Sequence, residues 1–172
     1  RDRSWAKEFM RDANIPTASF WKVNSLEEAK KIIHATSIPL VVKADGLASG
    51  KGVFIPDSKE ECFKATESIF NGKFGNSGKV VVLEEKIQGP EVSVFALCDG
   101  TKYILLPTAQ DHKRLNEKDK GPNTGGMGAY SPAPLLTNNY LERIIKEIIE
   151  PTINELNKNC LLYTSPSPRD SR

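Results

Sequence analysis

Lys43-Ala-Asp-Gly-Leu-Ala-Ser-Gly-Lys-Gly52 joins two apolar runs of the sequence and combines three glycines with two lysines. The glycines permit positive φ and let the backbone approach a ligand closely, because no Cβ stands in the way. Successive N–H groups in such a turn form a concavity that binds anions. The residues that would bind phosphate here are Gly46, Gly50 and Gly52 together with Lys43 and Lys51. The stretch therefore predicts a phosphate-binding loop, with a purely structural turn as the simpler alternative.

The spacing of this loop excludes a Walker P-loop. That motif has four residues between its glycines, and a Ser or Thr directly after the lysine supplies the hydroxyl that binds magnesium. Here three residues separate Gly46 from Gly50, and Gly52 follows Lys51. The loop is therefore expected to hold phosphate without the magnesium hydroxyl of a P-loop.

Short helices and strands are predicted on both sides of the loop. Two capping boxes, Ser25-Leu-Glu-Glu28 and Ser58-Lys-Glu-Glu61, each place a serine hydroxyl and a glutamate where they can bind free N–H groups at the start of a helix. Apolar runs typical of buried strands lie before and after the loop. The expected elements are helices over residues 4–14, 26–36 and 59–70 and strands over residues 40–44, 53–55 and 79–85.

The second half is predicted to contain a hairpin, a long loop and a helix. Asp99-Gly100, between apolar runs at 92–98 and 102–106, is a strong hairpin signal. Residues 107–134 lose periodicity, which predicts a functional or disordered loop. A stripe at helical spacing predicts an amphipathic helix that Pro151 kinks or ends: Leu141, Ile144, Ile145, Ile148 and Ile149. Capped helices with hairpins, and no regular strand–helix repeat, favour an α+β fold.

Composition narrows the classes of function. The 172 residues carry a formal net charge of +2, from 24 basic and 22 acidic side chains, so the sequence gives no sign of a nucleic-acid-binding surface. No apolar run approaches the roughly 20 residues that a membrane-spanning helix needs. Cys62, Cys98 and Cys160 are odd in number and widely spaced, which favours buried free thiols and a reducing compartment, the cytoplasm.

A second candidate site follows the strand expected at 79–85, in Leu83-Glu-Glu-Lys-Ile-Gln-Gly-Pro-Glu91. The exposed backbone groups at the end of a strand can pair with the edge of an adenine ring. A carboxylate a few residues later, such as Glu91, can accept hydrogen bonds from both ribose hydroxyls. Acidic residues at strand ends are usually solvated. The position of this pattern after a phosphate loop is what favours a nucleotide-binding role.

The third candidate is the long loop, which contains Gln110-Asp-His-Lys-Arg114 and Gly121-Pro-Asn-Thr-Gly-Gly-Met-Gly-Ala-Tyr-Ser-Pro132. Ordering four glycines without a ligand costs conformational entropy, which favours a functional loop over a simple linker. The adjacent Asp111, His112, Lys113 and Arg114 indicate a reactive cluster facing a phosphate site. Paired cysteine or histidine spacings for zinc are missing from the sequence, and so is a Gly-x-Ser-x-Gly turn.

These three blocks, in this order, resemble the phosphoribosylamine–glycine ligases, also called glycinamide ribonucleotide synthetases, of the ATP-grasp superfamily. The last block is the most specific, whereas other ATP-grasp enzymes share the lysine–glycine loop. The similarity runs from about Ala6 to Thr152. It implies an ATP-grasp fold, in which two α+β lobes clamp ATP, incomplete at both ends. The expected parts are an opening helix at 1–15, an ATP-clamping lobe at 16–87 and part of the catalytic lobe at 88–161.

The resemblance also implies a reaction. Such enzymes use ATP and Mg²⁺ (or Mn²⁺) to join glycine to 5-phosphoribosylamine through glycyl phosphate, a step of purine synthesis. Neither a nucleic acid nor a membrane is implied as a partner. The alternatives are another ATP-grasp carboxylate–amine ligase and a non-catalytic nucleotide-binding module. Whether the parent enzyme is fused to others, and its oligomeric state, stay open.

Site residues follow from the matching motif positions. Lys43 and Lys51 would contact phosphates, Glu84 to Ile87 would line the adenine and Glu91 would hold the ribose. The full expected ATP-binding set is Lys43, Gly50, Lys51, Gly52, Glu84, Glu85, Lys86, Ile87, Glu91, Arg114 and Asn123. The expected catalytic residues are Asp111, His112 and Arg114.

The sequence departs from the family after about Leu161. The family continues there into a strand with a Glu-Phe-Asn-type pair that binds magnesium, whereas this chain runs into Thr164-Ser-Pro-Ser-Pro-Arg-Asp-Ser-Arg172. We expect residues 162–172 to be non-native or disordered and the metal ligands to lie beyond the native end. The substrate-binding domain that precedes the ATP-grasp region in the family is also missing, so this chain alone is expected to be inactive.

Overall fold

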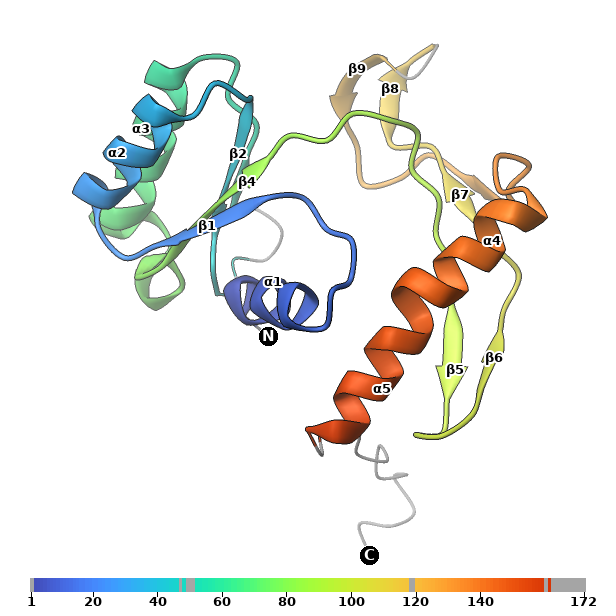
Figure 1. Cartoon of the computed structure of the whole chain (residues 1–172). Coiled ribbons are helices and arrows are strands. Elements are labelled where there is room, and N and C mark those ends of the chain that lie inside the picture. The colour runs from blue at the N-terminus through green and yellow to red at the C-terminus, as the bar shows by residue number, and fades with distance from the viewer. Residues whose placement is uncertain (1, 47, 49–51, 118–119, 160, 162–172) are drawn as a thin grey trace, which may run out of the picture. The chain divides into compact units, whose positions relative to one another are not determined.

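The computed structural model describes residues 2–46, 48, 52–117, 120–159 and 161. The chain forms two compact units, Arg1–Gln88 and Gly89–Arg172. Figure 1 shows their elements in chain order. Within the described residues, no helix is both long enough and apolar enough to cross a bilayer.

The first unit is built on an antiparallel sheet in the order β1-β4-β2-β3. The strands are β1 (Phe20–Val23), β2 (Leu40–Ala44), β3 (Val53–Phe54) and β4 (Val81–Glu85). Strand β4 lies in the middle, and its first four residues are all buried, as their unbroken apolar run predicts. The hairpin of β2 and β3 around the glycine loop is confirmed.

Helices cover both faces of this sheet. Helices α2 (Leu26–Ala35) and α3 (Lys59–Ser68) lie on one face, and α1 (Arg3–Asp12) lies on the other (Figure 1). Side chains alternate along a strand, so β4 sends Val81 and Leu83 into the core under α2 and α3. Val82 and Glu84 therefore point to the α1 face. The register pairs Val41 of β2 with Glu84 and Lys43 with Val82, so the side chains of Lys43 and Glu84 are diagonal neighbours on the α1 face.

Both predicted capping boxes are present. The Ser25 hydroxyl accepts a hydrogen bond from the Glu28 N–H at 3.2 Å, and the Glu28 carboxylate accepts one from the Asn24 N–H at 2.9 Å. Ser58 and Glu61 repeat the arrangement at the start of α3, with a Glu61 N to Ser58 Oγ distance of 3.1 Å. Local side-chain chemistry alone is enough to set these helix starts.

Other boundaries in the first unit differ from expectation. Strand β1 had not been expected, because four residues without a turn signal show no clear period. Strand β4 begins at Val81 rather than Lys79, since a π-helical turn at Ile69–Lys73 and a 3₁₀ turn at Gly75–Gly78 extend the connection from α3. Helix α1 ends at Asp12 and buries Ser4 and Lys7, whereas its apolar residue Trp5 is exposed.

The second unit contains the predicted hairpin, β5 (Ala96–Cys98) and β6 (Tyr103–Leu105). The Asp99 carboxylate fixes its turn by accepting from the N–H groups of Thr101 and Lys102, at 2.8 and 2.7 Å. These hydrogen bonds hold the pKa of Asp99 below its usual range. Cys98 is a free thiol but exposed, which contradicts its expected burial, whereas Cys62 is free and buried. Cys160 lies outside the described residues.

The expected long loop at 107–134 is wrong as a description of the whole segment. It contains four short strands: β7 (Gln110–Asp111), β8 (Arg114–Asn116), β9 (Lys120–Asn123) and β10 (Ala129–Tyr130). Strand β7 pairs with β10, and β8 pairs with β9. Strands of two to four residues are too short to show an alternating pattern.

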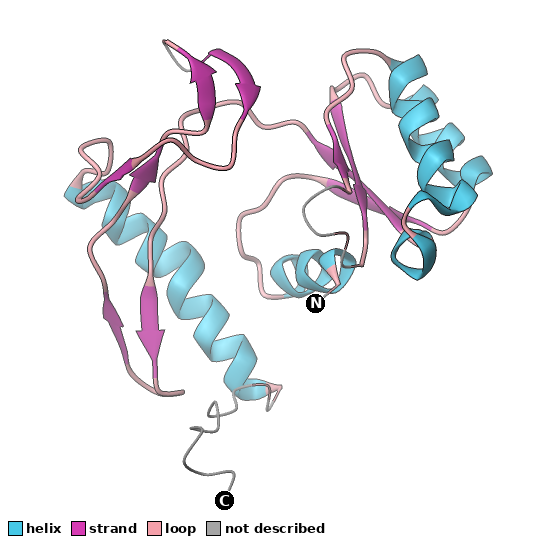
Figure 2. Cartoon of the chain, turned by 180° about the vertical axis from the view of Figure 1, so that it is seen from behind, coloured by secondary structure: helices cyan, strands magenta, loops and turns pink. Residues whose placement is uncertain are grey.

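The last helical segment continues through Pro151. Helix α4 (Asn138–Ile144) passes into a π-helical turn at Ile145–Ile149 and then into α5 (Glu150–Lys158). Pro151 lies in the first turn of α5, where a missing N–H costs little, so the expectation that it could end the helix is wrong. Seen from behind, this segment runs beside the hairpin (Figure 2), and the Tyr103 hydroxyl donates to Glu150 Oε1 at 3.2 Å.

Candidate functional site

A cluster of three charges lies on the α1 face of the first sheet. Lys43 Nζ is 2.6 Å from Glu84 Oε2, and Lys7 Nζ is 2.6 Å from Glu84 Oε1. The Glu84 and Lys7 side chains are about nine-tenths buried, and that of Lys43 is 26% exposed. The structure thus joins two residues expected at a nucleotide site, Lys43 and Glu84, with Lys7, which the sequence had not singled out.

The two lysines keep Glu84 ionised despite its burial. Burial by itself raises the pKa of a carboxyl group, but the ion pairs with Lys43 and Lys7 outweigh it, so the pKa of Glu84 lies below its ordinary value. No donor in the described part of the chain meets hydrogen-bond geometry at the buried Oε2 atom, although Lys43 is close enough to pair with it in charge. That oxygen is shielded from solvent, and Lys43 is its partner in charge.

Two of the backbone N–H groups after Glu84 already donate hydrogen bonds within the chain. The N–H of Glu85 donates to the Ser19 carbonyl at 2.8 Å, and the N–H of Lys86 donates to the Pro39 carbonyl at 2.9 Å. Lys86 also lies 3.6 Å from Asp57, which is a surface ion pair. The N–H of Ile87 has no partner among the described residues, and its side chain is 69% exposed. Of this expected adenine-binding segment, Ile87 is therefore the residue with a free backbone donor.

The glycine loop is anchored at its start to α1. The Asp45 carboxylate accepts hydrogen bonds from the Ser4 N–H at 2.6 Å and from the Ser4 hydroxyl at 2.9 Å. The Arg3 guanidinium donates to the carbonyls of Ala44 and Gly46, the latter at 3.2 Å. These four contacts hold the first turn of α1 against the end of β2, an arrangement that no sequence pattern predicts.

The far end of the loop is tightly packed at Gly52, whose carbonyl accepts from the Ala44 N–H at 2.8 Å. A Cβ added there would lie 2.7 Å from the Cβ of Ala48, so only glycine fits without a shift. Two expected phosphate-binding residues, Gly50 and Lys51, lie outside the described residues.

In the second unit, Lys113 joins two of the expected residues. Its Nζ lies 3.5 Å from Asp111 Oδ2 and 3.5 Å from Glu91 Oε2. The pairing raises the pKa of Lys113, with Asp111 as the larger cause and Glu91 as the smaller. Glu91 is exposed, so its carboxylate is open to solvent as a ribose-binding group must be before binding.

His112 packs against an aromatic ring in the same region, with the two rings tilted by 47°. Its ring lies 5.2 Å from that of Tyr130, whose hydroxyl donates to Gln110 Oε1 at 2.6 Å. The backbone of His112 is fixed by hydrogen bonds to Gly128 and Met127, each 2.8 Å long. Tyr130 is thus a second residue that the sequence had not proposed, although it belongs to the glycine-rich block that carried the resemblance.

Arg114 and Asn123 are directly opposite each other in the β8–β9 ladder. The register brings together the backbones of two residues expected at the nucleotide, and their side chains lie outside what the structure describes. Among the described residues, no group of three or more histidine, cysteine or acidic side chains could hold a metal ion. The expected residues that the structure brings together are Lys43 and Glu84 in the first unit and, through Lys113, Glu91 and Asp111 in the second.

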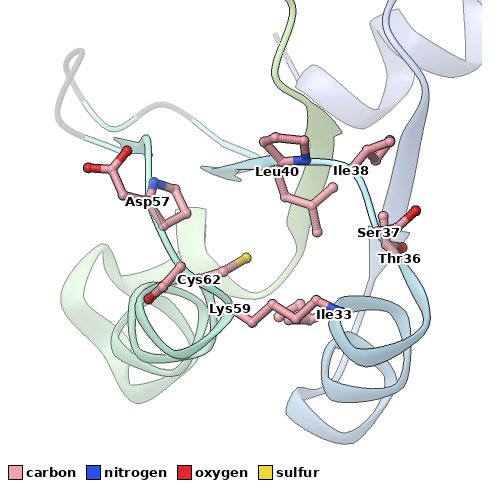
Figure 3. A pocket seen from close by; sticks show the side chains of 11 residues that line it. Ile33, Thr36, Ser37, Ile38, Leu40, Asp57, Lys59 and Cys62 are labelled. Atoms are coloured by element: carbon pink, nitrogen blue, oxygen red, sulfur yellow. The ribbon is translucent and has the colours of Figure 1, made fainter.

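A separate cavity of about 200 Å³ lies on the α2–α3 side of the first unit. Figure 3 shows Cys62 and Lys59 from α3 and Ile33 from α2 around it. Burial raises the pKa of the Cys62 thiol to about 11, and Lys59 donates to the His34 carbonyl at 2.9 Å. None of its described lining residues belongs to the expected nucleotide site, so this cavity is not that site.

Comparison with known proteins agrees with the three motif blocks. Residues 1–165 match the family model for phosphoribosylglycinamide synthetase, ATP-grasp (A) domain. A phosphoribosylamine–glycine ligase from Mesorhizobium japonicum is 49% identical over 151 residues, which is 88% of this chain and 36% of that protein. The bifunctional purine biosynthetic protein PUR2,5 of Pichia angusta is 47% identical over 158 residues, 91% of this chain and 20% of that protein.

Solved structures give the same fold. The phosphoribosylamine–glycine ligase of Thermotoga maritima matches with a TM-score of 0.79 at 37% identity, over 92% of this chain and 40% of that one. A D-Ala:D-Ser ligase from Enterococcus faecalis matches with a TM-score of 0.67 at 22% identity, over 91% of this chain and 45% of that one, which shows the fold alone. This chain spans 36–45% of the length of the three named ligases. It has the ATP-grasp fold and belongs to the phosphoribosylglycinamide synthetase ATP-grasp (A) domain family.

Proposed function

We propose that this chain binds ATP as part of an enzyme that joins glycine to 5-phosphoribosylamine, with release of ADP and phosphate. The observation that carries the proposal is the ion pair between Lys43, which begins the glycine loop, and the buried Glu84 of β4. Lys43 has spare N–H donors for phosphate oxygens, and the Glu84 carboxylate can accept from an amino group on a ring. ATP carries both kinds of group.

Each expected residue then has a task. Lys43, together with Lys51 and the backbone of Gly50 and Gly52, binds phosphate oxygens. Glu84 accepts from the adenine amino group, and the backbone of Glu85, Lys86 and Ile87 lines the ring. The remaining ATP-binding residues are Glu91 at the ribose and Arg114 and Asn123 near the reacting phosphate.

Catalysis is assigned to Asp111, His112 and Arg114. ATP supplies the phosphoryl group that activates the glycine carboxylate as glycyl phosphate, and the amine of phosphoribosylamine then displaces phosphate. Arg114 neutralises charge on the transferred group, while Asp111 and His112 orient the reacting groups. Lys113 holds the Asp111 carboxylate in place through their 3.5 Å contact.

The partners in this proposal are small molecules: ATP, glycine and 5-phosphoribosylamine. The relatives named as phosphoribosylamine–glycine ligases support this choice of substrates. We propose Mg²⁺ or Mn²⁺ as the metal, with ligands outside the described residues, and the cytoplasm as the compartment.

Isothermal calorimetry tests the nucleotide part of the proposal. The unaltered chain should bind ATP, and Lys43→Met should weaken that binding about tenfold, because one ion pair to phosphate is lost. Lys22→Met is the matched control, since Lys22 is a partly exposed lysine of the same unit paired with Glu8 at 3.2 Å. Unchanged ATP affinity in Lys43→Met would refute the phosphate role.

Substrate choice is tested in a protein of the relatives' full length. ADP release should depend on glycine and on phosphoribosylamine together. A preference for another carboxylate would instead assign the chain to a different carboxylate–amine ligase. ATP binding without ADP release under any of these conditions would favour a non-catalytic nucleotide-binding module.

A further inference from the structure

Two lysines face one buried carboxylate in the first unit, and the three groups carry one surplus positive charge. We propose that Lys7 is a positioning residue that keeps Glu84 paired, so that Lys43 is free to leave it for a phosphate group. The inference rests on the proposed ATP binding and assigns a role to a residue outside the three motif blocks.

Lys7 has no donor left for a ligand. An ammonium group has three N–H donors. Those of Lys7 meet Glu84 Oε1 at 2.6 Å, Thr17 Oγ1 at 2.7 Å and the Ala18 carbonyl at 3.3 Å. The residue is 8% exposed, so the contacts are shielded from water. Lys7 can therefore influence a ligand only through Glu84.

Lys43 is in the opposite position. Among the described residues, Glu84 is its one side-chain partner, and its side chain is 26% exposed. At least two of its three donors remain for other acceptors. Lys43 also belongs to β2, directly before the glycine loop, whereas Lys7 is held inside α1. The mobile charge of the pair is therefore Lys43.

The energetics make Lys7 necessary for that movement. A buried carboxylate that loses its only cation is strongly destabilising, because neither water nor another charge replaces it. Without Lys7, each transfer of Lys43 to phosphate would leave Glu84 in that state. With Lys7 at 2.6 Å, Glu84 keeps a cation even when Lys43 moves to a phosphate group. The movement of Lys43 then leaves no unpaired buried charge, so it does not weaken ligand binding.

The test compares ATP with adenosine by calorimetry on the full chain. Lys7→Met should weaken ATP binding about tenfold, because Lys43 is then retained by Glu84. Adenosine has no phosphate for Lys43, so its affinity should change less than about twofold. Lys7→Arg should restore most of the ATP affinity, and Lys22→Met, which removes a surface lysine of the same unit, should leave both affinities unchanged.

A double-mutant cycle separates this role from a purely structural one. In the Glu84→Gln background no buried carboxylate holds Lys43 back from the phosphate, so Lys7→Met should change ATP affinity less than about twofold. Equal losses for ATP and adenosine, or an equal loss in the Glu84→Gln background, would overturn the role of Lys7. Absence of ATP binding by the unaltered chain would overturn the proposed function and this inference with it, whereas ATP binding insensitive to Lys7→Met overturns this inference alone.

A milder variant covers the case in which Lys7→Met does not fold. Thr17 is exposed, and Thr17→Val removes only its 2.7 Å hydrogen bond to Lys7. With Lys7 less firmly held, ATP affinity should fall about threefold and adenosine affinity should stay the same. Unchanged ATP affinity in Thr17→Val would contradict the proposal.

Discussion

The two units differ in how they bury apolar surface. The first has a contiguous core that includes Val23, Val42, Ile69, Val81 and Leu83, none of which is exposed. In the described part of the second, the buried apolar residues are Ala133 and Ile153. Its hairpin strands place Leu97 opposite Ile104, with exposures of 55% and 63%. Burial of apolar surface therefore stabilises the first unit more than the second.

The candidate site residues follow the same division. Glu84 and Lys7 are buried and tightly paired, whereas Glu91 and Lys113 are exposed and 3.5 Å apart. Charges in a buried cluster keep their geometry because every alternative is costly. Exposed pairs are screened by water and contribute little. The first unit therefore carries the preformed part of the site.

The largest expected effect contrasts the two leucines of this comparison. Leu83→Ala, in the middle of β4, should lower the free energy of unfolding by about 3–4 kcal/mol through lost burial and a residual cavity. Leu97→Ala should lower it by less than about 0.5 kcal/mol, because the side chain is already exposed. Urea denaturation followed by circular dichroism measures both. Similar losses would show that the second unit has a core of equal weight.

The next effect concerns the buried charges of the first unit. Glu84→Gln should lower the free energy of unfolding by about 2–3 kcal/mol at neutral pH, because both lysines lose their partner. The pKa of Glu84 is lowered on folding, so its contribution is present above the ordinary value of 4.5 and is lost as the pH falls through the folded pKa. The gap between the two proteins should therefore close below pH 4.5.

Thermal unfolding across a series of acidic buffers measures this gap. A gap that stays constant down to acid pH would mean that Glu84 acts through packing rather than through charge. Lys86→Met serves as the control, since its ion pair with Asp57 is at the surface and spans 3.6 Å.

A smaller effect comes from the helix caps. Ser58→Ala should cost about 1 kcal/mol, because the first turn of α3 loses its side-chain acceptor. Thr137→Ala, at the start of α4 in the second unit, should cost less, since its contact with the Tyr140 N–H is 3.5 Å long. The midpoint of urea denaturation reports both. A larger loss from Thr137→Ala would reverse the ranking of the two units.

The smallest effect is expected at the surface of the second unit. Arg143 pairs with Glu147 one helical turn away at 3.0 Å, and both side chains are exposed. Arg143→Ala should leave the unfolding midpoint unchanged within error, because solvent already screens the pair. A clear drop would show that this turn of the helix supports more of the structure than its exposure indicates.

Local chemistry let the sequence predict much of the fold. Ser25, Ser58 and Asp99 bind N–H groups within a few residues of themselves, so their capping boxes and hairpin turn can be recognised without any distant contact. The short strands β7 to β10 could not be predicted, because each is defined only by pairing with another segment. Of the two outcomes expected at Pro151, a kink or an end of the helix, the end is wrong, since the helical segment continues through a π-helical turn that composition does not reveal.

The order of the three motif blocks was enough to identify the family without coordinates. It also predicted Lys43 and Glu84 as residues of the nucleotide site. The pairing of both Lys43 and Lys7 with the buried carboxylate of Glu84 became visible only in the folded chain, because it joins residues far apart in sequence. In the sequence, Lys7 resembles a solvated surface charge, because the same helix carries Trp5 on an apolar side. It is buried because α1 turns its polar side toward the sheet, where the alternation of β4 places Glu84.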